Sequence, residues 1–232
     1  MLAESLERFD REVPASASVL DVGGWAKPLT RADWVLDVMP YATRGLLGSD
    51  GDGPERFGEE TWVERDICDR TPWPFEDDQF DFVVCSHVLE DIRDPLWVAS
   101  ELSRVAKAGY VEVPSRLEEQ SRGLQGDWVG WGHHHWLIEL EGDRFDFLFK
   151  PHIIHSREEF WFPHSFWTGL TEEQRVERLW WTGSFETREV LLFGPGELDE
   201  DLAGFVSRHM PDRPPPPRRG LRQRARALAG RS

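Results

Sequence analysis

Apolar residues in the first half of the chain occur in short runs separated by polar turns. Such runs are typical of strands that are covered on both faces of a sheet. They predict strands at residues 18–22, 34–38, 61–66, 80–85 and 110–113. Apolar residues at helical spacing predict helices over residues 2–12 and from Pro95 to Gly109. The order of these elements predicts an α/β fold with a mostly parallel sheet, whose ligands bind beyond the carboxyl ends of the strands.

The pattern changes after Pro114, where the sequence becomes rich in Trp, His and Phe. Strand-like segments at 136–141 and 145–150 flank Gly142-Asp143, which predicts an antiparallel hairpin. The capping box at 171–174 predicts a helix through about Trp181. A last strand is expected at 185–193.

These elements predict one domain over residues 1–212. The parallel strands lie in 18–114, and an aromatic- and histidine-rich cap covers 115–195. Residues 213–232 are rich in Pro and Arg, and this composition predicts a disordered tail.

The charge of the chain argues against a nucleic-acid substrate. The net charge is −16, and the seven Arg of residues 213–232 stand without an acidic residue, so removing them leaves −23 on residues 1–212. Such a surface repels phosphate backbones. We therefore expect the folded body not to bind nucleic acid, and we expect an acidic partner or an anionic surface for the basic tail.

We also expect a cytoplasmic protein. No apolar run is long enough to cross a bilayer, and the first residues lack the apolar region of a signal peptide. Cys68 and Cys85 are the only cysteines, too few for a disulfide framework.

One stretch carries a family resemblance. Residues 74–91 read Pro-Phe-Glu-Asp-Asp-Gln-Phe-Asp-Phe-Val-Val-Cys-Ser-His-Val-Leu-Glu-Asp. This run resembles the fourth strand and following segment of class I S-adenosylmethionine-dependent methyltransferases, of the small-molecule "methyltransferase type 11"-like branch. Asp91 departs from the pattern, because the family usually has a second His there. The resemblance covers about 18–114 and implies a Rossmann-like sheet and S-adenosyl-L-methionine as the cofactor, so that 18–114 would be the cofactor half of the domain.

The resemblance also implies a set of cofactor-binding residues. Asp21, Gly23 and Gly24 match the first motif of the family, although its third glycine and long helix are replaced by Trp25 to Pro28. The other matching positions lie at or after the ends of later strands: Asp37 for the ribose hydroxyls, Asp66 and Ile67 for the adenine, and Cys85 and Ser86 at the fourth strand tip. Taken one at a time, these residues also fit ordinary strand ends and turns.

Histidines are the candidate catalytic residues, since transfer to a hydroxyl requires removal of a proton. His87 follows the fourth strand and faces the cofactor crevice by motif. In a strand, His133 and His135 would share one face, and His152 or His155 would join them if the hairpin folds back. Such a cluster fits a base, a zinc site or structural packing, and we assign no metal ligand from the sequence.

The sequence thus predicts S-adenosylmethionine-dependent methyl transfer to a small acceptor, with O-methylation of a sugar or saccharide intermediate as the leading case. Two alternatives remain open. One is a non-catalytic regulator or binding module that kept the methyltransferase fold. The other is a metal-dependent hydrolase that uses the histidine cluster.

Overall fold

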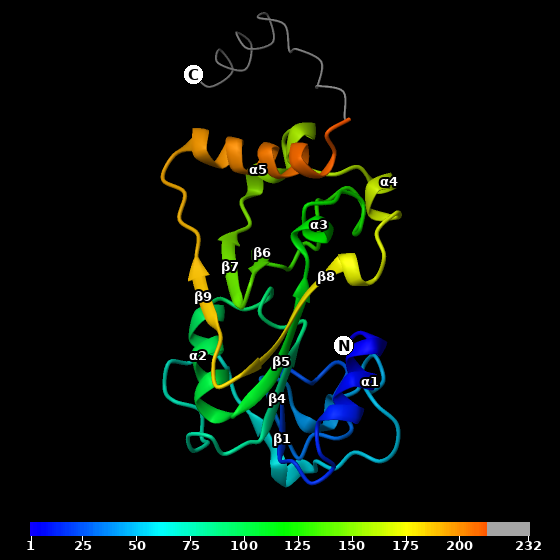
Figure 1. Cartoon of the computed structure of the whole chain (residues 1–232), viewed down its shortest axis with the longest axis vertical. Helices are drawn as coiled ribbons and strands as arrows, with labels where there is room; N and C mark the ends of the chain where they lie inside the picture. The colour runs from blue at the N-terminus through cyan, green and yellow to red at the C-terminus, as the bar shows by residue number, and fades with distance from the viewer. Residues whose placement is uncertain (213–232) are drawn as a thin grey trace, which may run out of the picture.

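The computed structural model describes residues 1–212, which contain two sheets (Figure 1). The larger sheet has the strand order β3-β2-β1-β4-β5-β8. Its strands are β1 (Val19–Val22), β2 (Trp34–Asp37), β3 (Trp62–Glu64), β4 (Phe82–Ser86), β5 (Ala108–Pro114) and β8 (Val176–Thr182). Strands β1 to β5 are parallel, and β8 pairs antiparallel with β5. This arrangement confirms the predicted mostly parallel α/β sheet.

Both faces of this sheet are covered, which explains why its strands read as nearly continuous apolar runs. On one face, Val19 and Val35 pack in a buried cluster with Phe9 of helix α1 (Ala3–Glu12). On the other face, Leu20 belongs to a second cluster with Val98 of helix α2 (Pro95–Val105). Figure 1 shows these helices on opposite sides of the sheet.

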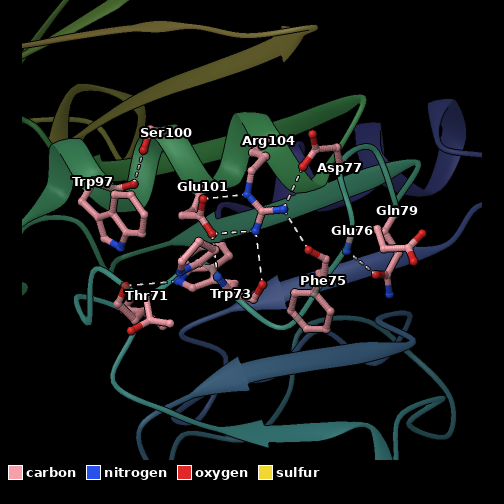
Figure 2. A network of polar contacts seen from close by, with 12 residues as sticks. Thr71, Trp73, Phe75, Glu76, Asp77, Gln79, Trp97, Ser100, Glu101 and Arg104 are labelled. Atoms are coloured by element: carbon pink, nitrogen blue, oxygen red, sulfur yellow. Dashed lines mark hydrogen bonds and ion pairs between the residues drawn. The ribbon is translucent and has the colours of Figure 1, made fainter.

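A polar network fixes α2 to the loop that leads into β4, as Figure 2 shows. The Arg104 guanidinium pairs with the buried Glu101 carboxylate at 2.7 Å and donates to the Phe75 carbonyl at 2.8 Å. Arg104 also reaches Asp77 at 3.0 Å, and Glu101 accepts the backbone N–H of Trp73 at 2.7 Å. Both members of the ion pair, Arg104 and Glu101, therefore hold the loop through charge-assisted hydrogen bonds.

The second half of the chain builds a smaller sheet with the order β6-β7-β9. Its strands are β6 (Trp136–Glu141), β7 (Arg144–Phe149) and β9 (Glu186–Glu189). The predicted hairpin is confirmed, because β6 and β7 pair antiparallel around Gly142, whose φ is +67°. β9 is shorter than the predicted strand 185–193 and pairs parallel with β7.

The predicted helix after the capping box is wrong. Thr171 and Gln174 do exchange the expected bonds, at 2.9 and 3.3 Å, but only a single 3-10 turn follows. The next residues form β8, which pairs with β5 from Ala108 to Pro114. Pairing with the open edge of β5 therefore overrides the local helix signal.

Gly109 does not end α2, as the sequence suggested. The helix ends at Val105, and Gly109 lies inside β5. A Cβ at Gly109 would stand 2.6 Å from the Trp181 ring and 2.7 Å from Val83. The glycine therefore allows the close approach of a ring from β8.

The sequence analysis did not find helix α5 (Pro195–His209), which lies across one end of the molecule in Figure 1. Its Leu202, Phe205 and Val206 are buried. Shorter helical elements complete the described chain: α3 (Arg116–Glu119), α4 (His164–Trp167), and 3-10 turns at Tyr41–Thr43, Glu59–Thr61, His152–His155, Glu158–Phe160 and Glu173–Arg175. Within residues 1–212, no helix has the length and apolar character to cross a membrane. The predicted disordered, basic tail at 213–232 lies outside the described residues.

Candidate active site

A cavity of about 820 Å³ opens beyond the carboxyl ends of the parallel strands, where the strand order reverses between β1 and β4. Open α/β sheets bind their ligands at this position. Residues from both halves of the chain form the wall: Gly23, Trp25, Ala26, Asp37, Val38, Leu47, Asp66, Ile67, His87, Val88, Glu90, Asp91, Ile92, Arg93, Pro114, Glu118, Trp131, His133 and His134. The cofactor half and the histidine-rich turn therefore meet at one cavity.

Many of the residues selected from the sequence line this cavity: Gly23, Asp37, Asp66, Ile67, His87 and His133. Asp21, Gly24, Cys85, Ser86 and His135 are not in its wall. Cys85 is fully buried in the core, and Ser86 Oγ donates to the Glu112 carboxylate at 3.1 Å. These two residues therefore lie behind the cavity lining and do not face the cavity.

The expectation for His133 and His135 changes in the structure. Residues 133–135 precede β6, which begins at Trp136, so the alternation of a strand does not apply to them. The rings of His133 and His134 lie 4.6 Å apart instead, and both residues line the cavity. His135 is exposed, and its backbone N–H donates to the carbonyl of Glu90 at 2.7 Å. The sequence reasoning therefore selected His135 where the structure presents His134.

The loop after β1 is folded tightly against its neighbours. Gly23 has a φ of +77°, and a Cβ there would stand 2.2 Å from Cγ2 of Val88. At Gly24, a Cβ would stand 2.2 Å from Oδ2 of Asp21. Glycine is required at both positions, because any side chain would displace the wall of the cavity or the carboxylate beneath it.

Asp21 has a structural role in this loop. Its Oδ2 accepts the backbone N–H of Leu29 at 2.9 Å, and the side chain is buried. Burial raises the pKa of Asp21 to about 7, and the bond from Leu29 only partly offsets this effect. Asp21 therefore holds the short connection between β1 and β2, in which the structure has no helix.

Asp37, at the end of β2, combines a structural role with a place in the cavity wall. Its two oxygens accept the backbone N–H groups of Trp25 at 3.0 Å and Met39 at 2.8 Å. Burial raises the pKa of Asp37, while these bonds lower it. A carboxylate offers about four acceptor positions, so two remain for donors in the cavity, such as ribose hydroxyls.

Asp66 and Ile67 lie on the same wall beyond β3. Ile67 is 7% exposed and gives an apolar surface. Asp66 pairs with Arg93 at 2.7 Å, and this hydrogen bond lowers the pKa of the carboxyl group. Both partners are largely exposed, so the pair is weak and a ligand group can replace it.

His87 adopts a left-handed backbone conformation, with φ of +56°, directly after β4. This conformation is uncommon outside glycine and marks a functional or strained position. Its ring lies between two buried carboxylates, with Nε2 3.2 Å from Glu112 and Nδ1 3.4 Å from Glu90. Both ring nitrogens therefore point at acceptors.

The charge of His87 follows from these contacts. Burial lowers the pKa of His87, but the hydrogen bonds to Glu112 and Glu90 outweigh it and raise the pKa to about 9. On the other side of the bond, burial raises the pKa of Glu112, but the bond from His87 helps to bring it down to about 2. The pair is therefore imidazolium and carboxylate at neutral pH, and a protonated His87 does not act as a general base.

His134 has a different environment. Its Nδ1 lies 2.9 Å from Oε1 of Glu119, which is 1% exposed and also accepts from the backbone of Trp131 and from Lys150. Burial raises the pKa of Glu119, but its bonds to His134 and Lys150 bring it below the usual value. An ionised carboxylate only accepts, so Nδ1 of His134 must donate. Its Nε2 then faces Asp91 at 3.6 Å.

The sequence analysis assigned no role at this site to several of its polar residues, among them Glu90, Asp91, Glu119 and His134. Asp91 was noticed as a departure from the family pattern, yet it received no role. Glu90 follows the selected His87 by three positions, the spacing of side chains that meet across one turn. Glu119 carried no signal, because its contact with residues 131–150 depends on tertiary folding.

The cavity fits the cofactor that the resemblance implies. Its volume holds a molecule of nucleoside size. Asp37 retains acceptor capacity, Ile67 gives an apolar surface, and Gly23 keeps the backbone of the first loop close to the wall. Glu90 is 1% exposed and its Oε2 has no hydrogen-bond partner within residues 1–212, so an unpaired acceptor lies beside the cavity.

Comparison with known proteins gives a match to one family. A model of the methyltransferase domain matches residues 51–111, from before β3 into β5. A search of curated proteins finds no significant match.

Similar solved structures include a SAM-dependent methyltransferase from Aquifex aeolicus, with 20% identity over 51% of this chain and 68% of that chain and a TM-score of 0.34. The YcgJ protein from Bacillus subtilis is 18% identical over 49% of this chain and 52% of that chain, with a TM-score of 0.33. An arsenic(III) S-adenosylmethionine methyltransferase from Chlamydomonas reinhardtii is 19% identical over 43% of this chain and 39% of that chain, with a TM-score of 0.30.

The aligned part spans about half the length of these proteins. The family match covers β4 and α2, and the parallel strands follow the order in which the methyltransferase-like sheet was expected. By this match the chain is similar over residues 51–111 to the methyltransferase domain, and its larger sheet has the mostly parallel form expected for a Rossmann-like methyltransferase.

Proposed function

We propose that the protein transfers a methyl group from S-adenosylmethionine to an oxygen of a small acceptor, a saccharide or another ring-bearing molecule. The observation that carries the proposal is the shared cavity, which Asp37 and Ile67 of the first half and His133 and His134 of the second half all line. When bound, the cofactor supplies an electrophilic methyl group on a sulfonium. Alignment of the two reactants is then the main task of the protein.

Asp37, Asp66 and Ile67 are the residues that hold the nucleoside in this proposal. Asp37 uses its free acceptor positions for the ribose hydroxyls, and Asp66 exchanges Arg93 for a donor on the adenine. His87, as a cation between Glu90 and Glu112, orders the turn after β4 and adds no free base to the site. Here His87 is a positioning residue.

His134 is the residue that takes the acceptor proton. Glu119 holds Nδ1, so Nε2, which faces Asp91 at 3.6 Å in the lining of the cavity, is the ring nitrogen that takes the proton. Burial lowers the pKa of His134, but the bond to Glu119 raises it above the usual value, and the neutral form of the ring is the one that accepts the proton. A carboxylate that orients an imidazole and stabilises its charged form is a recurring device of general base catalysis.

The Trp-lined side of the cavity supports a ring-bearing acceptor. A smaller cavity of about 320 Å³ adjoins this side and shares Trp131 and His134 with the larger one. Trp128 and His155 face it, with ring centres 4.9 Å apart. Aromatic faces of this kind pack against the apolar face of a sugar or of another ring.

Calorimetric titration with S-adenosylhomocysteine tests the cofactor part of the proposal. We expect one equivalent to bind, and Asp37→Asn to weaken binding about tenfold or more, since a charged acceptor is lost. Asp33→Asn is the matched control, because Asp33 also accepts a backbone N–H, that of Val19 at 2.9 Å, but is not in the cavity wall. No binding to the unmodified protein, or equal losses in the two variants, would overturn the proposal.

Methyl transfer itself is tested with isotope-labelled S-adenosylmethionine and a panel of saccharides and phenols. Label on an oxygen of an acceptor supports the proposal, and His134→Gln should then reduce turnover much more than cofactor affinity. If labelled product never forms while the cofactor analogue binds, the non-catalytic binding module becomes the better account.

A further inference from the structure

Three side chains at the edge of the cavity bring their ligand atoms together. Asp91, His133 and His134 each offer one atom, and these atoms lie within 4.8 Å of one another. Oδ1 of Asp91 is 3.6 Å from Nε2 of His134 and 3.8 Å from Nε2 of His133. All three residues line the cavity that also contains Asp37. Two imidazoles and one carboxylate therefore converge on one point.

The hydrogen bond of His134 prepares it as a ligand. Nδ1 donates to Glu119, whose other oxygen accepts from Lys150 at 2.9 Å. Gly130, with a φ of +62°, lies so close that a Cβ would stand 2.8 Å from Oε2 of Glu119. The carboxylate that orients the imidazole is thus held from several sides. In metal sites, a carboxylate commonly fixes the ring nitrogen that does not bind the metal.

Unpaired acceptors make this edge of the cavity suited to a cation. Oδ1 of Asp91 is buried and has no hydrogen-bond donor among the described residues. Neighbouring Glu90 is 1% exposed and also has an oxygen, Oε2, without a partner there. Buried polar atoms are nearly always paired in native proteins, so two orphan carboxylate oxygens beside two imidazoles need an occupant.

We propose that Asp91, His133 and His134 bind one divalent transition-metal ion, with Zn²⁺ as the reference case. Imidazole ligands favour first-row ions such as Zn²⁺ or Fe²⁺ over Mg²⁺ and Ca²⁺, which prefer oxygen ligands. Zinc bonds to nitrogen and oxygen measure about 2.0–2.2 Å, which places ligand atoms about 3.4 Å apart in a tetrahedron. The two separations from Asp91, 3.6 and 3.8 Å, need only a small contraction, and the ligand atoms of the two imidazoles, which lie within 4.8 Å of each other, must also approach.

The site has three protein ligands and so leaves at least one coordination position open. The binding of the metal ion does not depend on the proposed function, but the effect of the ion on the acceptor does rest on the proposed methyl transfer. Nε2 of His134 then binds the ion, and an acceptor hydroxyl bound at the open position has a lowered pKa and releases its proton to water. A proton and a metal compete for the same lone pair, so only one of these roles holds for His134 at a time.

Titration of untagged, chelator-treated protein with Zn²⁺ tests the inference without any cofactor. We expect one equivalent to bind, and Co²⁺ in its place to give visible absorption bands. His133→Ala and Asp91→Asn remove one ligand each from positions that are 60% and 39% exposed, so the fold should persist. Each should weaken Zn²⁺ binding at least about tenfold, and Glu119→Gln should weaken it about 10- to 100-fold.

His135→Ala is the matched control, since this neighbouring histidine does not belong to the cluster. It should leave Zn²⁺ affinity unchanged. Less than one equivalent bound, or an equal loss in His135→Ala and His133→Ala, would overturn the inference. Titration of the same sample with S-adenosylhomocysteine separates the two proposals: zinc binding without cofactor binding leaves the metal site standing, and the reverse result removes only the metal site.

Discussion

Two clusters of charged side chains in this protein differ in how completely they are paired. Under α2, Glu101 and Arg104 satisfy each other and the loop at 73–77, and together they fix the path into β4. At the cavity, Glu90 and Asp91 keep buried oxygens without a partner among the described residues, although histidines lie nearby. A fully paired cluster is typical of a structural role, whereas buried groups left unpaired beside a cavity indicate a site for a ligand.

The largest expected effect is on the paired side of this comparison. Arg104→Ala leaves Glu101, which is 4% exposed, as a buried charge without its partner. We expect a loss of about 3 kcal/mol in the free energy of unfolding, measured by urea denaturation. S-adenosylhomocysteine affinity of the folded variant should stay the same. Arg70→Ala is the control: Arg70 is 75% exposed in its pair with Asp94, and its loss should cost less than about 1 kcal/mol. Equal costs for the two variants would contradict a structural role for the network.

Gly23→Ala tests the packing of the loop that borders the cavity. The new Cβ would require a left-handed backbone and would stand 2.2 Å from Val88. We expect about 2 kcal/mol of lost stability, together with weaker cofactor binding. Gly142→Ala is the control. Gly142 has a φ of +67°, but a Cβ added there would meet no atom within 4 Å, so the substitution should cost about 1 kcal/mol of stability from backbone strain alone. If the two substitutions cost the same, Val88 does not confine the loop.

The pH dependence of stability tests the charged state of His87. Its pKa is about 9 in the folded protein and about 6.5 when unfolded, so the stabilisation is complete at low pH and is lost as the pH rises through 9. Asp21 and Glu177, whose pKa values burial raises to about 7, also titrate near this range, so the effect of His87 must be taken as the difference between the unmodified protein and His87→Gln.

Between pH 7 and 9, the unfolding free energy of the unmodified protein should fall by about 1 kcal/mol more than that of His87→Gln. The expected change in free energy is smaller than the full pKa shift would give, because 47% of the His87 side chain is exposed and solvent screens its charge. Parallel curves for the two proteins would show that His87 is not the cation between Glu90 and Glu112.

The smallest expected effect on stability comes from the unpaired side. Asp91→Asn removes a carboxylate whose Oδ1 has no donor within residues 1–212, so the unfolding free energy should change by less than about 0.5 kcal/mol. Zn²⁺ binding should nevertheless weaken at least about tenfold. A loss of stability as large as that of Arg104→Ala would mean that Asp91 belongs to a structural network, and the comparison would fail.

The sequence contained much of the first half of the fold. Buried strands such as β4 read as apolar runs, and Asp94 with Pro95 indicated the start of α2, which the structure confirms through a bond from Trp97 N–H to Asp94 at 3.2 Å. These signals are local, and burial on both faces of the sheet agrees with them.

The second half depended on distant contacts. The capping box of Thr171 forms its bonds, yet β8 follows because the edge of β5 offers a partner. Helix α5 did have a local signal, with Pro195 at its first turn and Leu198, Leu202 and Phe205 at helical spacing. The helix was not predicted, because the Pro-rich segment that follows it indicates a disordered tail.

The candidate site was predicted in part. Asp37, Asp66 and His87 were selected from motif positions, and all line the cavity. His134 was passed over, because strand alternation was applied to residues that lie in a turn before β6. Its partner Glu119 belongs to α3, and no sequence spacing connects the two.

The most direct test of this account is a crystal structure of the protein with S-adenosylhomocysteine. We predict the ligand in the 820 Å³ cavity, with its ribose at Asp37, its adenine against Ile67 and its sulfur toward the His87 end. A ligand in the separate cavity of about 630 Å³ beside Arg8 and Trp180, or no ligand at saturating concentration, would contradict it.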